Sequence, residues 1–299
     1  MRLIKMIIVI TGPTCLGKSE TAYELAKVLN AEIVNGDAFQ CYKEMDIGVA
    51  KPEEKYLKEV KHHLYSFVNP DHNYSIAEYQ TNLRNKIDEL SKQNKNIIIV
   101  GGSGLYIRSA LYDYDFLEDK NIDMSKYEAM DNRTLHDELR KIDRIEAEKI
   151  HMNNRKRVLR AIYIYLSSGE AKSSLVAKQE HKPIYEARFF VRDFDRDLLY
   201  KNIDKRVDKM VEEGLENEVR NLYVKYGKKV RSLQAIGYKE FIEYFENKIS
   251  KENAIELIKK NTRNYAKRQL TFIRHQFPVE YYIDTMDLLR KITNDSLFG

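Results

Sequence analysis

Eight consecutive residues near the start of the chain have the types and the spacing of a phosphate-binding loop. They are Gly12, Pro13, Thr14, Cys15, Leu16, Gly17, Lys18 and Ser19, and they match the pattern G-x-x-x-x-G-K-[ST]. In such a loop, backbone N–H groups and a helix dipole converge on phosphate oxygens. Lys18 would add a full charge, and the Ser19 hydroxyl would ligate a phosphate-bound Mg²⁺ ion. The motif therefore predicts a bound di- or triphosphate, but it does not identify the reaction.

The residues around this loop are those of a strand and a helix. An apolar, β-branched run at 7–10 precedes it, and apolar residues at helical spacing between Ala22 and Leu29 follow it. Further strands are expected at 31–34, 96–100 and 187–191, with a helix at 76–93 that has Ser75 as its N-cap. Strands that alternate with helices indicate a parallel sheet. We expect an α/β fold with a P-loop NTPase-like parallel sheet core.

Two more turns should meet the phosphate loop at one edge of this sheet. Asp37 follows the second strand, and the turn 101–104, which contains Ser103, follows the strand at 96–100. Ligands of parallel sheets bind where the strands end, so the three turns can form one site. From its position alone, Asp37 can be a general base, a magnesium-associated carboxylate or a turn residue.

The middle of the chain predicts a separate, helical insertion. It is highly charged and helical in period, with Leu135, Leu139, Val158 and Ile162 among its apolar residues, and it contains no clear strand. We expect the first part of the core at 1–116, a helical insertion at 117–186, and the rest of the core with basic C-terminal helices at 187–299.

Seven stretches in order resemble the tRNA dimethylallyltransferases, also called tRNA isopentenyltransferases. Besides the phosphate loop, they are Asp37 to Pro52 (family pattern D-S-x-x-x-Y-x-x-x-D-I-G-T-A-K-P), Val100 to Tyr106, Ile150 to Ala161, Gly214 to Val219, Gln234 to Glu240, and Thr262 to Phe272. The resemblance spans nearly the whole chain. The sequence departs from the family at Ala38 for Ser, Ser103 for Thr, Met152 for Pro and Phe272 for Trp.

This resemblance implies transfer of a dimethylallyl group from its diphosphate to N6 of adenosine 37 in tRNAs that read codons starting with U. Asp37 would accept the N6 proton, because the amine lone pair is delocalised into the adenine ring. The loop, Lys18, Mg²⁺ at Ser19, Ser103 and Arg220 would stabilise the leaving diphosphate. Arg220 is assigned from its place two residues after Glu218 in the family-like stretch. A surface arginine on a helix is the other interpretation of it.

The expected partner is a tRNA anticodon stem-loop, whose unstacked bases proteins read by their edges and by stacking. Basic residues cluster at 155–160 and at 259–274, and either cluster can also be an ordinary solvated helix face. Phe39 and Tyr42 can stack on bases or pack in the core. The residues expected to bind tRNA are Asp37, Ala38, Phe39, Gln40, Ser103, Lys156, Arg157, Arg160, Lys239, Arg263, Lys267 and Arg268.

The amino-acid composition is compatible with this hypothesis and excludes few classes of protein. The 299 residues carry a formal net charge of +5, and the two cysteines, Cys15 and Cys41, lack the spacing of metal ligands. No apolar run reaches the ~18 residues of a membrane span. We expect a reduced, cytoplasmic protein, with nothing that demands more than a monomer.

Three other functions compete with the transferase. A small-molecule P-loop kinase would use the same loop on ATP, although the strand at 96–100 ends in Gly-Gly-Ser where many nucleotidases carry an Asp. A second competitor would prenylate free adenine nucleotides, although the long basic insertion and tail favour tRNA. A non-enzymatic RNA-binding protein is the third, and it leaves the phosphate loop and Asp37 without a purpose.

Overall fold

The computed structural model describes residues 7–116 and 120–294 and divides the chain into two compact units. The core unit comprises Met1–Leu111 and Tyr185–Gly299, and the insertion unit comprises Tyr112–Ile184. The expected start of the insertion at 117 lies outside the described residues. The insertion unit takes in the segments on either side of its helices because they pair with each other, through the bridge Tyr112–Pro183 and the hydrogen bond from Asp113 N to Lys182 O at 3.0 Å.

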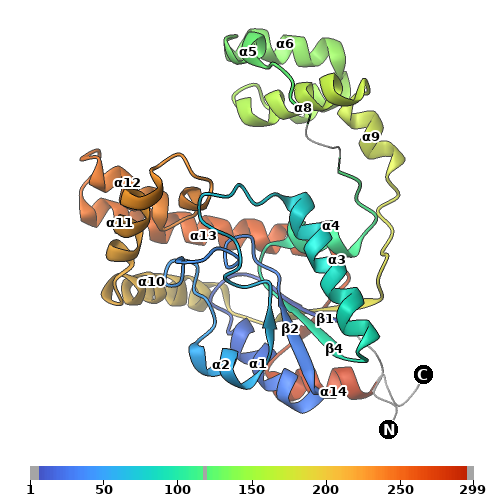
Figure 1. The fold of residues 1–299 in the computed structure, drawn as a ribbon, viewed down its shortest axis with the longest axis vertical. Coiled ribbons are helices and arrows are strands. Elements are labelled where there is room, and N and C mark those ends of the chain that lie inside the picture. The colour runs from blue at the N-terminus through green and yellow to red at the C-terminus, as the bar shows by residue number, and fades with distance from the viewer. Residues whose placement is uncertain (1–6, 117–119, 295–299) are drawn as a thin grey trace. The chain divides into compact units, whose positions relative to one another are not determined.

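A six-stranded parallel sheet is the centre of the core unit (Figure 1). Its strands are β1 (Ile7–Thr11), β2 (Ala31–Asn35), β3 (His62–His63), β4 (Asn96–Val100), β5 (Ala187–Arg192) and β6 (Val279–Tyr282), in the order β3-β2-β4-β1-β5-β6. The expected α/β class is confirmed. β1 lies between β4 and β5, so the loop that follows β1 leaves the middle of the sheet.

Helices cover both faces of this sheet (Figure 1). On one face, α1 and α14 pack on Ile8 and Ile10 of β1 and Ile98 of β4, which are at most 1% exposed. The helices α3 and α4 pack together on the other face, and α3 starts at the expected cap, where Ser75 Oγ accepts from Glu78 N at 3.1 Å. The bounds of these helices are α1 (Lys18–Leu29), α3 (Ile76–Lys92), α4 (Gly104–Leu111) and α14 (Thr285–Asn294).

A group of C-terminal helices completes the core unit and reaches the carboxyl edge of the sheet. The long helix α13 contacts both α4 and α10, and α11 and α12 pack beside it. Their bounds are α10 (Arg196–Glu212), α11 (Leu215–Tyr226), the short 3₁₀ helix η1 (Ser232–Gln234), α12 (Tyr238–Phe245) and α13 (Lys251–Gln276). None of the helices within 7–116 and 120–294 is both long and apolar enough to cross a membrane.

Sequence patterns miss the shortest elements of the core unit. The helix α2 (Glu54–Glu59) and the two-residue strand β3 are too short to show a period. The edge strand β6 lies in a segment expected to be mostly helical. Its Tyr282 is fully buried in the core and its backbone pairs with β5, from Phe189–Val279 to Arg192–Tyr282, so packing of the aromatic ring onto the sheet decides its conformation.

The insertion unit is helical, and its described residues form no strand beyond one isolated bridge. The expected apolar residues Leu135, Leu139, Val158 and Ile162 are all fully buried in one cluster. This unit therefore has a hydrophobic core of its own. Its helices are α5 (Ser125–Glu128), α6 (Asn132–Ile142), α7 (Arg144–Lys149), α8 (Arg155–Ser168) and α9 (Lys172–Lys178).

Candidate active site

The phosphate loop joins β1 to α1, as expected, and curves around the N-terminus of the helix. Gly12 and Gly17 have φ angles of +134° and +70°, which residues with a Cβ rarely adopt, and α1 begins at Lys18. The Lys18 ammonium donates to Pro13 O at 2.6 Å, closing the loop on itself. Residues 14–19 line a cavity of about 1050 Å³, whereas Gly12 and Pro13 are buried and support it.

Lys18 lies in a site that disfavours its own charge. Burial, and secondly the nearby Arg206 guanidinium, lower the pKa of Lys18 to about 8. A cation that is desolvated in this way, with another cation beside it, gains free energy when an anion binds. The electrostatics of the loop therefore favour a multiply charged anion such as a diphosphate.

Asp37 follows β2 and points into the same cavity. Its backbone N–H donates to Asn35 Oδ1 at 2.8 Å, and its Oδ1 accepts from Phe39 N at 2.9 Å, so the turn holds the carboxylate in place. Burial raises the pKa of Asp37 above its usual value, and the Phe39 N–H and Lys18 only partly oppose this. A raised carboxylate pKa is what general-base chemistry near neutral pH needs.

Ser103 lies beside Asp37 at the end of β4. Its backbone N–H donates to Gly36 O at 3.2 Å, and its Oγ accepts from Ala38 N at 3.0 Å. Gly36 N in turn donates to Val100 O at 2.8 Å, which fixes the two turns together. Ala38 takes part through its backbone, so the serine that the family has at this position is not needed for the contact.

The structure does not bring Arg220 to this site, and the expectation for that residue is corrected. Its guanidinium pairs with Glu216 at 2.9 Å and lies 4.1 Å from the centre of the Phe245 ring, away from the cavity-lining residues. Arg206 of α10 lies at the loop instead, donating to Thr14 Oγ1 at 3.0 Å and approaching Cys15 Sγ at 3.6 Å. No sequence pattern distinguishes Arg206 from the other charged residues of α10. Its contact with the phosphate loop depends on how α10 packs against that loop.

Two residues of α13 complete the site, although sequence patterns assigned them no role. The buried Gln269 accepts from Thr14 N at 3.2 Å and donates to Gly102 O at 2.9 Å, so it joins the phosphate loop to the turn after β4. A Cβ at Gly102 would lie 2.0 Å from the Gln269 amide, so a larger residue there would displace this amide from its two bonds. Burial raises the pKa of Tyr265 to about 12, so its hydroxyl stays a neutral donor beside Ser103.

A Mg²⁺ ion fits this site as a companion of phosphate. Among the described residues, no group of three or more His, Cys, Asp or Glu side chains could hold a metal. Mg²⁺ commonly takes one or two protein ligands together with substrate phosphates and water. Ser19, which is half-buried and lines the cavity at the start of α1, can supply one such ligand.

The residues of the core unit that were expected to bind tRNA have different surroundings in the structure. Phe39 and Gln40 line the cavity with Asp37, and Arg268 lines it from α13, whereas Tyr42 is fully buried in the core. Arg263 pairs with Asp204 of α10, and Lys239 lies 3.7 Å from the Glu240 carboxylate. Lys267 is exposed on α13. Arg263 therefore ties α13 to α10, and its expected contact with tRNA stays a prediction.

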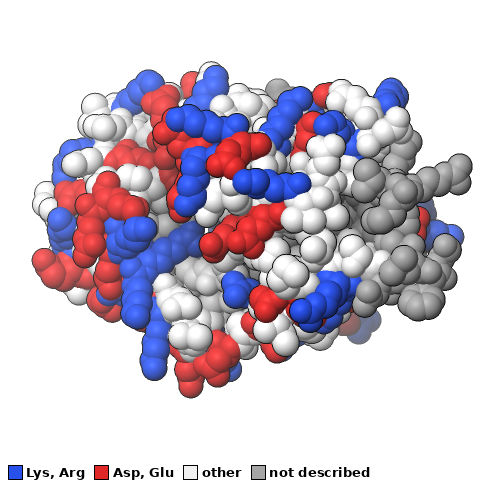
Figure 2. All heavy atoms as spheres, turned by 90° about the horizontal axis from the view of Figure 1, so that it is seen from below, with Lys and Arg blue, Asp and Glu red and all other residues white. Residues whose placement is uncertain are grey.

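In the insertion unit, Lys156, Arg157 and Arg160 are exposed along the start of α8. Their neighbour Arg155 is not, because its guanidinium donates to Met130 O at 2.7 Å and Glu128 O at 2.6 Å. The face shown in Figure 2 has basic and acidic side chains interspersed, so the net charge is not gathered there.

Comparisons with known proteins identify relatives of this chain. A family model described as IPP transferase matches residues 40–276. A tRNA dimethylallyltransferase from Bacillus anthracis is 41% identical over 283 residues, 92% of this chain and 90% of the relative. The crystal structure of a tRNA isopentenylpyrophosphate transferase from Staphylococcus epidermidis is 38% identical, with a TM-score of 0.73 over 98% of this chain and 99% of that one.

A third relative extends the likeness beyond bacteria. A eukaryotic dimethylallyltransferase, described as acting on tRNA, has a TM-score of 0.84 at 27% identity, over 98% of this chain and 80% of that one. The family model and the curated relative each cover well over half of the chain. The chain belongs to the IPP transferase family.

Proposed function

We propose that this protein transfers a dimethylallyl group from dimethylallyl diphosphate to N6 of adenosine 37 in tRNAs that read codons starting with U. The products would be N6-isopentenyladenosine and diphosphate. The observation that carries the proposal is the convergence of the phosphate loop, Asp37 and Ser103 on one cavity of about 1050 Å³. The names of the relatives support the substrate classes, and the family resemblance supports the nucleotide position.

The residues suit a displacement at the first carbon of the prenyl group. The N6–C bond forms as the C–O bond to diphosphate breaks, and the N6 proton passes to the Asp37 carboxylate. The backbone of the loop, Lys18 and Arg206 hold the departing diphosphate. Ser103 and Tyr265 supply neutral hydroxyls beside the carboxylate. Mg²⁺ bound at Ser19 would neutralise charge on the diphosphate.

The tRNA would place its base in the cavity and its backbone on exposed cations. An enzyme that acts on a base must take it out of the stack. Phe39 and Gln40 lie next to Asp37 to receive it, and Arg268 lines the cavity from α13. Lys156, Arg157 and Arg160 of α8 and Lys267 of α13 are exposed and would contact phosphates. We place this activity in the cytoplasm and propose that a monomer carries it out.

The test offers the purified protein every substrate that the competing functions would use. It is incubated with Mg²⁺, dimethylallyl diphosphate, ATP, AMP and unmodified tRNA, and the products are identified by mass. We expect prenylated tRNA, with the group mapped to adenosine 37 after digestion. A transcript with guanosine at position 37 is the matched control. Phosphorylated small molecules, or prenylated AMP without prenylated tRNA, would refute the proposal.

Codon preference and use of ATP need separate arms of the same assay. Transcripts that read codons starting with U are compared with transcripts that read other codons, each with adenosine at position 37. We expect only the first set to be modified. ATP is then added as a competitor, and inhibition that dimethylallyl diphosphate overcomes would show that its phosphates occupy the same loop.

A further inference from the structure

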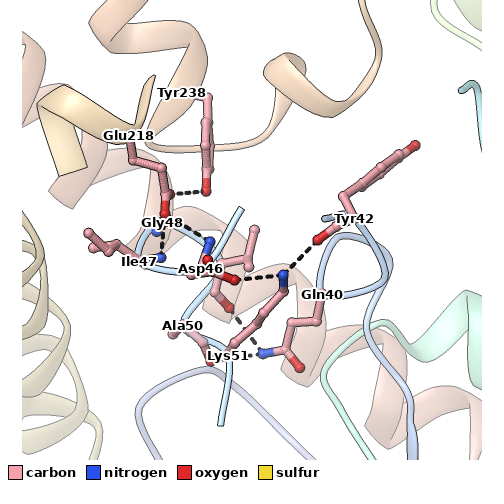
Figure 3. A network of polar contacts seen from close by, with 10 residues as sticks. Gln40, Tyr42, Asp46, Ile47, Gly48, Ala50, Lys51, Glu218 and Tyr238 are labelled. Carbon is pink, nitrogen blue, oxygen red and sulfur yellow. Dashed lines mark hydrogen bonds and ion pairs between the residues drawn. The ribbon is translucent and has the colours of Figure 1, made fainter. Parts of the chain in front are cut away.

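The Glu218 carboxylate binds three consecutive backbone N–H groups of a loop more than 160 residues earlier in the sequence (Figure 3). Its Oε2 accepts from Asp46 N and Ile47 N, both at 2.8 Å, and its Oε1 accepts from Gly48 N at 3.0 Å. The Tyr238 hydroxyl donates to the same Oε1 at 2.6 Å. Four donors from two other parts of the core unit thus converge on one side chain.

The negative charge of Glu218 strengthens its hydrogen bonds to this loop. Successive N–H groups that point to one spot form an anion-binding concavity, and bonds to a carboxylate are about twice as strong as neutral ones. Within the described residues, no Lys or Arg forms an ion pair with Glu218. The loop is also pressed onto α12, because a Cβ at Gly48 would lie 2.5 Å from the Tyr238 ring.

Gln40 and Lys51 also hold this loop (Figure 3). The Gln40 amide donates to Val49 O at 3.0 Å and Ala50 O at 2.9 Å. The Lys51 ammonium, 8% exposed, donates to Tyr42 O at 2.6 Å and pairs with Asp46 at 2.7 Å. Residues 46–50, here called the clamp loop, are therefore fixed between the Asp37 turn and helices α11 and α12.

All residues of the clamp loop line the cavity, and its apolar members contribute to the apolar part of the cavity wall. Ile47 and Val49 of the loop, Leu215 at the start of α11 and Ile236 before α12 contribute apolar side chains. The phosphate loop and Arg206 supply the charged part of the same cavity. The five-carbon group is the wholly apolar portion of the proposed substrates, so the apolar wall is the surface suited to it.

We propose that Glu218 is a positioning residue that fixes the clamp loop, so that Ile47 and Val49 form the wall against the prenyl group and limit its length. This inference rests on the proposed function. Glu218 does not line the cavity, so it would act on the substrate only through the backbone of the loop. If the loop is released, the wall recedes, and the site should bind the five-carbon chain more weakly while tolerating a longer one.

The test compares Glu218→Gln with Glu216→Gln, a matched control on the same helix. Glu216 pairs with Arg220 and Lys251 and does not line the cavity. Glutamine at 218 keeps the size but replaces one acceptor with a donor that faces the same N–H groups. Amide hydrogen exchange of Asp46, Ile47 and Gly48 is measured first, because it needs no substrate. Steady-state kinetics with dimethylallyl and geranyl diphosphate follow, together with the affinity for inorganic diphosphate.

In Glu218→Gln, we expect faster hydrogen exchange at those three amides. The KM for dimethylallyl diphosphate should rise about tenfold. The ratio of kcat/KM for dimethylallyl diphosphate to kcat/KM for geranyl diphosphate should fall about tenfold. Affinity for inorganic diphosphate should change less than twofold, because the phosphate loop is untouched. Tyr238→Phe removes one donor and should shift the same quantities in the same direction by less. It also keeps the inference testable if Glu218→Gln does not fold.

Two outcomes would overturn the inference: unchanged exchange at residues 46–48, or a loss of activity with unchanged preference between the two prenyl chains. The second would show a general structural role for Glu218. The parent enzyme separates this failure from that of the proposed function. A parent that transfers no prenyl group to tRNA refutes the proposed function, while the exchange experiment still decides whether Glu218 holds the loop.

Discussion

The two sides of the cavity are built in different ways. The phosphate side consists mainly of residues 12–19, which lie together because they are adjacent in the sequence. The helical side consists of Arg206, Tyr265 and Gln269, which reach the site from α10 and α13. The comparison teaches that local motifs identify the ligand class, whereas the residues that complete the site depend on how distant helices pack.

The two basic clusters differ in a similar way. On α8, Lys156, Arg157 and Arg160 are exposed. On α13, Lys259 pairs with Asp208 at 2.8 Å, and Arg263 pairs with Asp204. Clusters of like composition thus differ, since the α8 residues are exposed whereas part of the other cluster holds α13 to α10.

Replacing Asp37 tests the strongest feature of the phosphate side. Asp37→Asn keeps the size and the turn but cannot accept a proton, so we expect kcat to fall by about 10²–10⁴-fold. Binding of both substrates should persist. In the parent, activity should rise with pH as Asp37 loses its proton, with the midpoint above the ordinary carboxyl pKa of 3.8 because burial raises it. A variant with kcat within threefold of the parent would remove Asp37 from the general-base role.

Replacing Arg206 or Arg220 with alanine tests which of the two arginines binds diphosphate on the helical side of the cavity. Arg206→Ala should weaken inorganic diphosphate binding by roughly 10–100-fold, because a bond to a charged group contributes about 1.5–3 kcal/mol. Arg220→Ala should change it less than twofold, since that guanidinium lies on Phe245. Titration calorimetry of each variant measures the difference. Equal effects from the two variants would contradict the placement of Arg206 at the phosphate loop.

Changing pH tests the charge of Lys18. Its pKa of about 8 in the free protein means that the side chain loses its proton as the pH rises through that value. Diphosphate binding needs the charged form, so affinity should weaken above about pH 8, by at most about tenfold per unit. Lys18→Arg stays charged and serves as the control, so the weakening should be absent from it. If the parent and Lys18→Arg lose diphosphate affinity in parallel as the pH rises, Lys18 is charged over the whole range. The Lys18→Ala variant should bind tRNA with nearly the affinity of the parent.

Salt dependence tests the basic cluster on α8. Each phosphate contact adds roughly 0.7–0.9 to the slope of log affinity against log salt, so replacing Arg157 and Arg160 together with Ala should lower the slope for tRNA by about one or two. Arg155→Ala should instead lower the melting temperature, because its guanidinium bonds to the carbonyls of Met130 and Glu128. Equal slopes for the parent and the double variant would direct the search for the tRNA path to Lys267 and Arg268.

The sequence by itself determined the parallel sheet, the phosphate loop, and the meeting of Asp37 and Ser103. Those features depend on short-range patterns, since a strand followed by a glycine turn and a helix folds in the same way wherever it occurs. Parallel strands then bring their ends to one edge whatever the rest of the chain does.

The tertiary structure alone decided the roles of the two arginines, of Gln269 and of Glu218. Arg206 and Arg220 both lie on charged helices, and Gln269 bonds to Thr14 across 255 positions. Which side of such a helix meets the site depends on the crossing of α10, α11 and α13 with the core. That crossing is set by many weak side-chain contacts over long sequence separations, and a single sequence carries no local signal for it.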